Sequence, residues 1–316
     1  MNAAPVSPVP PVRISCRNCR TKLDASELEP FSLVPCPVCG TQLRIPRRFD
    51  RYLLEKVCGI GGMSKIYRAI DTQLERRVAI KILNASKGSP EESARLFFNE
   101  AKVVAGLDHP GIVPVYQCGI AENSPFLVMR YLSGGDLERL LKRRMLPPRP
   151  VVMGFLATVA DALLYMLNEA QLVHHDIKPS NILLDGEGGA QLGDFDLADR
   201  REFGDVETPC EEWGSPGYIS PERLYSGGED SRGDIFSLGV TIYELVSGVT
   251  PFGIQGEPEE LYERRRAMQF APLAETAPEV SDELSSLTGR MLAFDAAERP
   301  GYPEILKVLR REAGAG

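Results

Sequence analysis

The chain has 316 residues, of which 43% are hydrophobic and 25% charged, with a formal net charge of −8. This composition is ordinary for a globular protein, and the length allows a sizeable core and more than one average domain. The negative charge excludes a general attraction to nucleic acids or anionic membranes, although the first fifty residues lean basic.

The two ends of the chain carry no pattern of folded structure. Residues 1–12 are proline-rich without a continuous apolar block, so we expect a disordered tail rather than a secretory signal, and residues 313–316 a flexible one. We find no apolar stretch of about 20 residues, the length that spans a bilayer. The run from Ile235 to Val246 is interrupted by Glu244 and suits a buried helix. We therefore expect a cytoplasmic protein without a membrane anchor.

Four of the seven cysteines form two Cys-x-x-Cys pairs separated by residues 20–35. This spacing lets two thiolate pairs converge on one tetrahedral zinc ion, and it fits metal ligation better than a disulfide framework. The intervening piece is too short and polar to fold on an apolar core alone, so the metal would supply most of its folding free energy. The predicted zinc ligands are Cys16, Cys19, Cys36 and Cys39.

Residues 13–46 resemble a zinc ribbon. Three interpretations remain open for this segment: a structural ribbon that recruits a protein partner, a nucleic-acid-binding ribbon that uses its arginines, and a redox or vestigial site. The structural ribbon is favoured and a nucleic-acid partner is not, although any nucleic-acid role would lie in this basic segment.

A pattern of strands begins near residue 50. Residues 52–57 lead into the run Gly59-Ile60-Gly61-Gly62-Met63-Ser64, and residues 65–70 are predicted to form a second strand. In dinucleotide-binding folds a similar glycine run opens a helix, whereas here it connects two strands and lets the backbone approach phosphates. The run resembles the glycine-rich loop of protein kinases, with Ser64 replacing the third glycine, and is similar to that of bacterial Ser/Thr kinases.

A lysine and a glutamate follow in the order that this resemblance implies. Lys81 ends a short apolar strand, residues 78–81, where a positive charge can hold nucleotide phosphates. A helix begins near Ser89, which caps it, and carries Glu100 among apolar neighbours. A carboxylate in such surroundings needs a partner, so we predict a Lys81–Glu100 ion pair.

The run from Phe126 to Leu132 resembles the strand and hinge of a kinase against which adenine binds, with Met129 in the gatekeeper position. Backbone groups at the hinge would meet the base, and small or apolar side chains would enclose the ring. The ATP-binding residues implied by the resemblance are Cys58, Gly59, Gly61, Gly62, Ser64, Ile66, Ala79, Lys81, Met129, Arg130, Tyr131, Leu132 and Leu183.

The run His174-His175-Asp176-Ile177-Lys178-Pro179-Ser180-Asn181, followed by Asp194-Phe195-Asp196, resembles the catalytic loop and metal-binding turn of a protein kinase. The resemblance implies that Asp176 orients the substrate hydroxyl and accepts its proton, while Lys178 neutralises the transferring phosphoryl group. Asn181 and Asp194 would hold magnesium. Lys178 at this spacing is typical of Ser/Thr kinases, and His174 is expected to stack on Phe195.

Two residues depart from the family pattern. His175 stands where arginine commonly binds a phosphate on the activation segment, so we expect activity without phosphorylation of Thr208. Asp196 stands where the family has glycine, and its extra carboxylate near the metals is expected to alter the preference among divalent cations.

The downstream motifs complete the resemblance. Ser215 lies in a run that resembles the substrate-docking loop, Glu222 ends that loop and is predicted to pair with Arg299, and Asp234 begins an almost wholly apolar helix. Residues 50–312 are therefore expected to form a bilobal α+β protein-kinase fold, with a small β-rich N-lobe and a larger α-helical C-lobe, preceded by the zinc ribbon.

The predicted function is that of an ATP- and magnesium-dependent Ser/Thr protein kinase, which transfers the γ-phosphoryl group to protein hydroxyls in signalling. The alternative is a nucleotide-binding pseudokinase scaffold that acts through its ribbon. The kinase is favoured because the set formed by Lys81, Asp176, Asn181 and Asp194 is intact. The expected cofactors are ATP, Mg²⁺ and Zn²⁺.

Overall fold

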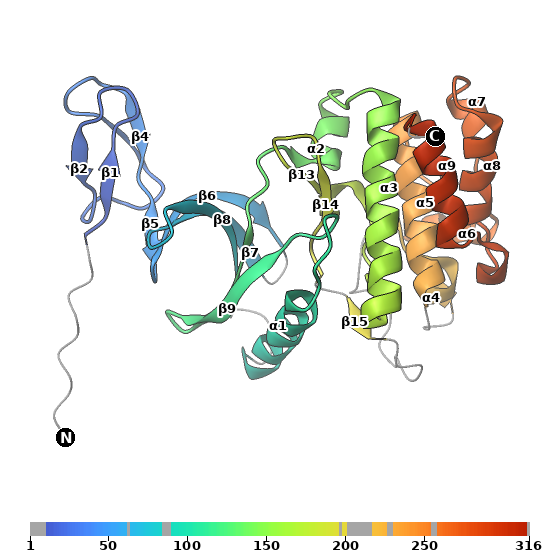
Figure 1. Ribbon diagram of the computed structural model, residues 1–316, viewed down its shortest axis with the longest axis horizontal. Coiled ribbons are helices and arrows are strands. Elements are labelled where there is room, and N and C mark those ends of the chain that lie inside the picture. Colours follow the sequence, from blue (N-terminus) through green and yellow to red (C-terminus); the bar gives the residue numbers. More distant parts are fainter. Residues whose placement is uncertain are drawn as a thin grey trace. The chain divides into compact units, whose positions relative to one another are not determined.

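The computed structural model describes residues 11–61, 64–83, 90–195, 198–200, 217–225, 230–253 and 258–314. The chain forms two compact units, Met1–Ala101 with Val115–Tyr131, and Lys102–Pro114 with Leu132–Gly316. Figure 1 shows strands predominating in the first unit and helices in the second. The predicted division into a β-rich N-terminal part and a helical C-terminal part is confirmed.

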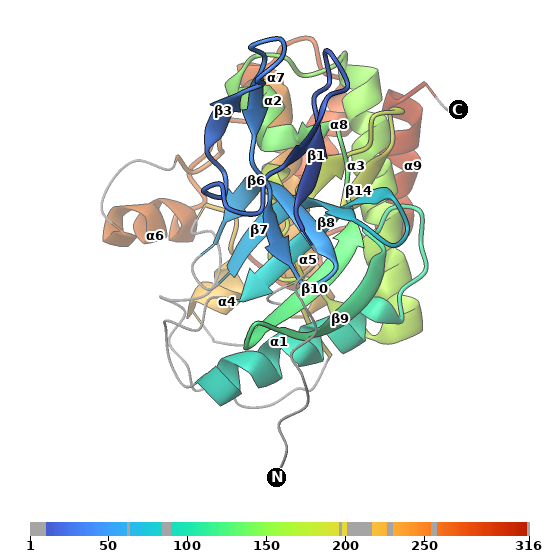
Figure 2. The ribbon, with the colours of Figure 1, turned by 90° about the vertical axis from the view of Figure 1, so that its left-hand side faces the viewer.

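The first unit contains a six-stranded antiparallel sheet with the strand order β5-β6-β7-β8-β10-β9 (Figure 2). Because successive side chains of a strand point to opposite faces, the sheet buries two separate clusters. One cluster includes Tyr67, Ile80 and Val128, and the other includes Leu127 and packs on helix α1 through Phe97. The elements are β5 (Arg47–Phe49), β6 (Tyr52–Ile60), β7 (Ser64–Asp71), β8 (Arg76–Leu83), α1 (Pro90–Ala105), β9 (Val115–Ala121) and β10 (Ser124–Arg130).

Two short hairpins precede this sheet in the same unit. They are β1 (Arg13–Ser15) with β2 (Lys22–Asp24), and β3 (Leu33–Pro35) with β4 (Gln42–Arg44). Their side chains alternate between solvent and a small interior. The four paired cysteines fill that interior, together with Ile14, Leu23, Val34 and Leu43. So small an apolar cluster cannot stabilise a domain by itself, which supports the expectation that a metal is needed.

Strand β5 links the hairpins to the sheet. It lies between the ranges predicted for the ribbon and the kinase fold, and it pairs with β6 as the edge strand of the larger sheet. Phe49 of β5 is buried and meets Phe126 edge to face, with ring centroids 5.5 Å apart. The segment that leaves the ribbon is therefore part of the sheet itself.

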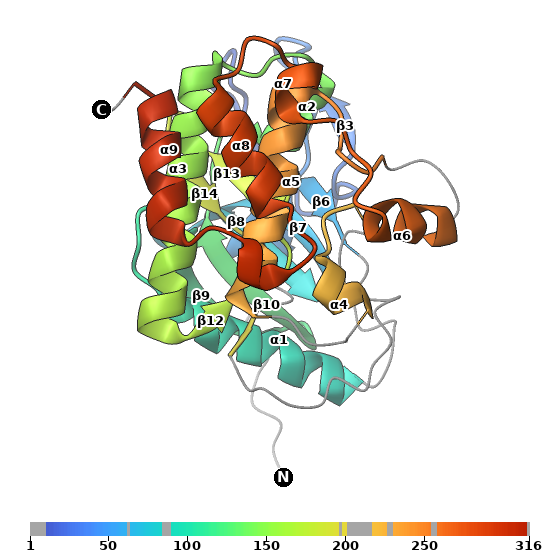
Figure 3. The ribbon, with the colours of Figure 1, turned by 90° about the vertical axis from the view of Figure 1, so that its right-hand side faces the viewer.

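The second unit is largely helical, and α3, α5, α8 and α9 lie side by side in it (Figure 3). Helix α5 begins after Asp230, whose side chain caps it, ends at Gly248 with φ +81°, and is buried along most of its length as predicted. The helices are α2 (Leu137–Lys142), α3 (Arg149–Tyr165), α4 (Pro221–Tyr225), α5 (Ser231–Ser247), α6 (Pro258–Arg266), α7 (Leu273–Thr276), α8 (Asp282–Met291) and α9 (Tyr302–Glu312), with the short helices η1 (Met166–Ala170), η2 (Pro179–Asn181) and η4 (Ala296–Glu298).

Two small sheets of the second unit frame the catalytic loop. One has the order β11-β13-β14 and the other pairs β12 with β15. Their strands are β11 (Gly135–Asp136), β12 (Leu172–Val173), β13 (Ile182–Leu184), β14 (Ala190–Leu192) and β15 (Asp199–Arg200). The loop that carries Asp176 runs from the end of β12 to the start of β13, so both of its ends are fixed by strand pairing.

One helix corrects the expectation that no apolar stretch reaches membrane-spanning length. The continuous helix Arg149–Ala170 has 22 residues, and its most apolar window has a mean hydropathy of 1.8. By length and composition alone it could cross a bilayer. It buries Met153, Leu156, Val159 and Leu163 within the second unit, as the core helix of a folded domain also does.

Candidate active site and metal site

Strand register brings several predicted nucleotide-binding residues to one face of the six-stranded sheet. Ile66 of β7 lies opposite Lys81 of β8, and Met129 of β10 lies opposite Ala79. Residues directly opposite in neighbouring strands share a face, and residues two apart in a strand do too, so these four side chains lie on one face of the sheet, which α1 also covers. Lys81 is almost fully buried there. The side chain of Glu100, on α1, lies outside the described residues, as does the predicted ion pair.

The glycine run lies between the paired strands β6 and β7, which is the context that the sequence predicted. Gly59 pairs with Ile66 across the two strands, and the amide of Gly61 donates a hydrogen bond of 2.9 Å to the carbonyl of Ser64. Cys58 is exposed and the side chain of Ser64 is buried. Gly62 lies outside the described residues.

The predicted hinge residues lie at the end of β10 and just beyond it. Arg130 ends β10, and the guanidinium of Arg68 lies 6.0 Å from the ring centre of Tyr131. Leu132 is buried, and Leu183 lies on β13 of the second unit.

The catalytic loop holds the carboxylate of Asp176 between two donors. Lys178 Nζ lies 2.6 Å from Asp176 Oδ2, and Asn181 Nδ2 donates to the same oxygen at 2.9 Å. Asn181 Nδ2 also donates to the carbonyl of Asp176 at 2.8 Å. Both donors meet Oδ2, so Oδ1 is the oxygen better placed to accept a substrate proton.

Asp234 makes contacts to the predicted catalytic loop that the sequence did not reveal. It is 2% exposed at the first turn of α5, and its two oxygens accept hydrogen bonds of 2.8 Å from the backbone amides of His174 and His175. His175 has φ +67°, a left-handed conformation that costs a residue with a Cβ about 1 kcal/mol. Arg223 donates to the carbonyl of His175 at 2.9 Å. Asp234 and Arg223 thus fix the backbone next to Asp176.

The metal-binding turn is anchored by ring packing. The rings of His174 and Phe195 have centroids 4.9 Å apart, so the predicted contact is present, but their planes are inclined by 54° and the rings are tilted rather than stacked. Phe195 is buried, whereas the preceding Asp194 is exposed and has φ +64°. This backbone turn buries the phenylalanine and directs the neighbouring carboxylate to solvent, where a cation can reach it. Asp196, Thr208 and Ser215 lie outside the described residues.

Burial lowers the pKa of His174 to about 4 from its ordinary 6.5, against the smaller opposing effect of the Asp176 and Asp194 carboxylates. Between these two pH values the unfolded chain binds a proton at this residue and the folded chain does not. We therefore expect the free energy of unfolding to fall as the pH drops from about 6.5 to 4, by at most about 3 kcal/mol. The measurement is urea unfolding at several pH values. In His174→Phe this part of the slope should be absent, and an unchanged slope would contradict the assignment.

Glu222 and Arg299 form the ion pair that the sequence predicted. Two guanidinium nitrogens of Arg299 lie 2.6 and 2.7 Å from the two oxygens of Glu222, and the Arg299 side chain is fully buried. Arg299 also donates to the carbonyl of Arg232 at 2.8 Å. This bidentate pair joins α4 to the end of η4 and to the first turn of α5.

A second polar contact near the predicted docking loop was not expected from the sequence. The hydroxyl of Tyr218 donates to the carboxylate of Glu244, and Ser237 Oγ donates to the carbonyl of Tyr218 at 2.8 Å. Burial raises the pKa of both Tyr218 and Glu244. Two residues of α5 therefore hold Tyr218, which lies within the run that contains Ser215 and ends at Glu222.

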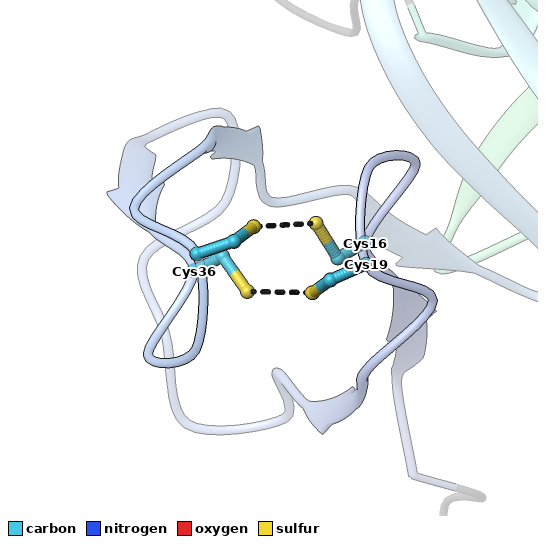
Figure 4. A group of neighbouring side chains, drawn as sticks. Cys16, Cys19 and Cys36 are labelled. Atoms are coloured by element: carbon cyan, nitrogen blue, oxygen red, sulfur yellow. Dashed lines mark hydrogen bonds between the residues drawn. The ribbon is translucent and has the colours of Figure 1, made fainter.

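The four cysteines of the hairpin pair lie together, as Figure 4 shows for the labelled Cys16, Cys19 and Cys36. The sulfurs of Cys16 and Cys39 are 3.6 Å apart, as are those of Cys19 and Cys36, and all four lie within 4.8 Å of one another. Zinc–sulfur bonds of about 2.3 Å in a tetrahedron would place the sulfurs about 3.8 Å apart. The cysteine geometry therefore fits a tetrahedral Zn²⁺ site.

The two halves of this site repeat the same local structure. The amides of Cys16 and Cys36 donate to the carbonyls of Thr21 and Thr41, at 2.9 and 2.8 Å. The residue after each second cysteine is left-handed, with φ +60° at Arg20 and +73° at Gly40. The repeat is visible in the sequence as Cys-x-x-Cys-x-Thr and could have been found there.

A threonine in each half supports the ligand next to it. The hydroxyl of Thr41 lies 3.3 Å from the sulfur of Cys39 and lowers the pKa of Cys39 to about 5, and the amide of Thr41 adds to this effect. In the other half, Thr21 lowers the pKa of Cys19 in the same way. Because zinc binds the thiolate form, both contacts prepare the site for metal.

Comparison with known proteins identifies the larger part of the chain. The model of the protein kinase domain matches residues 52–309. Serine/threonine-protein kinase PknL of Mycobacterium tuberculosis is 38% identical over 204 residues, which are 64% of this chain and 51% of PknL. A probable serine/threonine-protein kinase of Streptomyces coelicolor is 35% identical over 274 residues, 83% of this chain and 40% of the relative.

PrkC of Bacillus subtilis, also a serine/threonine-protein kinase, is 35% identical over 203 residues, 64% of this chain and 31% of the relative. The chain thus spans about half of the length of PknL and less than half of the length of the other two relatives. The matched region contains the glycine-rich hairpin, the catalytic loop, the metal-binding turn and the Glu222–Arg299 pair. The chain therefore belongs to the protein kinase family, alongside bacterial serine/threonine-protein kinases.

Proposed function

We propose that this protein is an ATP- and Mg²⁺-dependent kinase that phosphorylates serine and threonine hydroxyls of proteins in cytoplasmic signalling. The observation that carries the proposal is the carboxylate of Asp176, held by Lys178 and Asn181 in a loop whose backbone Asp234 fixes. The named serine/threonine kinases among its relatives support the substrate class. A pseudokinase scaffold is not favoured, because the residues for phosphate, metal and proton are all present.

Each residue of the candidate active site has its own role in phosphoryl transfer. Asp176 orients the acceptor hydroxyl and takes its proton while the new O–P bond forms and the bond to the ADP leaving group breaks. Lys178 and Lys81 place positive charge beside the phosphates. Asn181 and Asp194 would hold Mg²⁺, which neutralises phosphate charge when bound.

The test is to incubate the purified protein with γ-labelled ATP and magnesium and to identify the labelled amino acids after hydrolysis. We expect phosphoserine and phosphothreonine, in the protein itself or in an added protein acceptor. Label on tyrosine would contradict the substrate class. Wild-type label no higher than that of a sample without magnesium would contradict the kinase assignment and favour the scaffold.

We also propose that residues 13–46 bind one structural zinc ion before a kinase domain over 50–312, with short tails of residues 1–12 and 313–316. The support is the set of four clustered thiols and the repeated local structure that holds the two halves of the site. Leu33 and Val38 are exposed apolar side chains of this ribbon, 56% and 68% accessible, and offer a surface to a protein partner.

Replacing one zinc ligand should remove the metal. Cys36→Ser is expected to reduce bound zinc from about one ion per chain to nearly none, because three thiolates close the site poorly and the ribbon has little other core. The measurement is elemental analysis of the purified protein. The matched control is Cys118→Ser, an exposed cysteine of β9, which should keep its zinc. Equal zinc in both variants would contradict the site.

A further inference from the structure

We propose that the zinc ribbon sets the affinity for nucleotide from within the first unit, with Phe31 acting as a positioning residue for the glycine-rich hairpin β6–β7. This inference rests on the proposed function, because the hairpin is taken to cover ATP. It gives the ribbon a role inside its own chain, in addition to any external partner.

The contact that carries the inference joins the ribbon to the hairpin. Phe31 lies in the segment between the two Cys-x-x-Cys pairs, and its ring stacks on that of Tyr67 in β7. The ring centroids are 6.0 Å apart and the planes are inclined by 16°. Tyr67 is 7% exposed, and Phe31 packs against the buried cluster that also contains Tyr52 and Leu54 of β6. A ribbon side chain thus completes the core beneath both strands of the hairpin.

The ribbon holds Phe31 from its own side. The amide of Phe31 donates to the carbonyl of Ile45 at 2.7 Å, and Arg44 Nη1 donates to the carbonyl of Phe31 at 3.0 Å. Ile45 is 1% exposed, and its amide donates to the carbonyl of Ser32 at 3.0 Å. Phe31 has φ +65°, a conformation that a residue with a Cβ keeps only where its surroundings impose it. The position of the ring therefore depends on a folded ribbon.

A second contact reaches the hairpin from the first Cys-x-x-Cys turn. Arg17 lies between Cys16 and Asn18, and its guanidinium is 3.7 Å from the carboxylate of Glu55 in β6. Glu55 in turn lies 2.7 Å from Arg68 Nε in β7. The Arg17 side chain is 77% exposed, so this ion pair adds little free energy. Like the Phe31 contact, however, it joins the ribbon to the β6–β7 hairpin.

A change at the Phe31–Tyr67 contact can reach the nucleotide-binding face of the sheet through strand β7 of the hairpin. Tyr67 and Ile66 are adjacent in β7, and adjacent side chains of a strand point to opposite faces. Ile66 lies opposite Lys81, on the face of the predicted phosphate-binding residues, and pairs with Gly59 at the start of the glycine turn. A shift of Tyr67 toward space left by Phe31 therefore moves Ile66 and the turn as well. Proton acceptance at Asp176 belongs to the other unit and should be unaffected.

The test is the affinity of Phe31→Ala for magnesium-ADP, measured by calorimetry so that no phosphoryl transfer is needed. An effect passed through this aromatic pair cannot exceed the free energy of the pair itself, so we expect binding weakened by up to about tenfold, with a matching rise in KM for ATP and little change in kcat. Phe31→Trp, which keeps a stacking ring, should restore the affinity. Leu33→Ala is the matched control, because Leu33 is an exposed ribbon residue outside the contact.

Zinc content is measured on every variant, so that a lost contact is separated from a lost ribbon. If Phe31→Ala does not fold, Phe31→Leu is used in place of that variant, because leucine keeps apolar volume without the aromatic ring. Zinc-loaded Phe31→Ala, or its Leu substitute, with wild-type ADP affinity would overturn the inference, as would an equal loss in Leu33→Ala. A wild type that binds ADP in this ribbon-dependent way but transfers no phosphate would refute only the proposed function.

Discussion

Asp176→Asn is expected to lower kcat by roughly 10²–10⁴-fold while the protein remains folded. The asparagine amide has nearly the same shape as the carboxylate but cannot accept the hydroxyl proton. In the wild type, Lys178 and Asn181 contact a carboxylate oxygen of Asp176 at 2.6 and 2.9 Å. In the variant, these two donors would meet an amide group instead. The KM for ATP should change little, because Asp176 is assigned to the acceptor hydroxyl.

The measurement is a steady-state assay with labelled ATP, accompanied by thermal unfolding. Asp282→Asn provides the control, since Asp282 is an exposed aspartate in the first turn of α8 and should keep full activity. If Asp176→Asn is folded and retains more than about a tenth of the wild-type kcat, Asp176 is not the base.

The residues predicted from the sequence are those whose chemistry depends on short, ordered runs of residues. The catalytic loop, the glycine hairpin and the Cys-x-x-Cys pairs each place a few defined side chains within one turn or one strand, so their sequence spacing already fixes their local geometry. The Glu222–Arg299 pair is separated by 77 residues and was predicted only through the family resemblance.

The contacts that the sequence did not predict are made between distant segments. Asp234 accepts from the amide of His174 across 60 residues, and a carboxylate at the start of an apolar helix gives no sign of which backbone it will meet. The Phe31–Tyr67 stack depends on the left-handed backbone at Phe31, for which the sequence contains no glycine signal. In both cases tertiary packing decides the partner.

The long apolar helix and strand β5 were missed for different reasons. In helix Arg149–Ala170 the charged Asp161 interrupts the run of apolar residues, although the mean hydropathy of the helix stays high. Strand β5 contains Arg47 and Arg48, which are unlike residues of a buried strand, and only its third residue, Phe49, is buried. Edge strands are often polar in this way, because one side of their backbone faces no partner strand.

The other large effect is expected at Asp234. Asp234→Ala removes the acceptors of the buried His174 amide and of the half-buried His175 amide, at a cost of about 1–3 kcal/mol for the buried one and less for the other. It also removes the restraint that keeps His175 at φ +67°, so the backbone beside Asp176 can relax toward an ordinary conformation. A displacement of about 1 Å at a reacting group can cost 10²-fold in rate, and we expect a fall in kcat of about this size.

Asp234→Asn keeps one acceptor oxygen, so its losses of stability and of kcat should be smaller than those of Asp234→Ala. Urea unfolding and kcat, measured well below the melting temperature, give the two effects separately. Asp230→Ala is the matched control: Asp230 caps the same helix through the amide of Arg232, and its loss should cost about 1 kcal/mol of stability. Because Asp230 does not contact the catalytic loop backbone in any described hydrogen bond, its removal should leave kcat near the wild-type value. A folded Asp234→Ala with kcat equal to that of Asp230→Ala would show that α5 supports the loop only through overall stability.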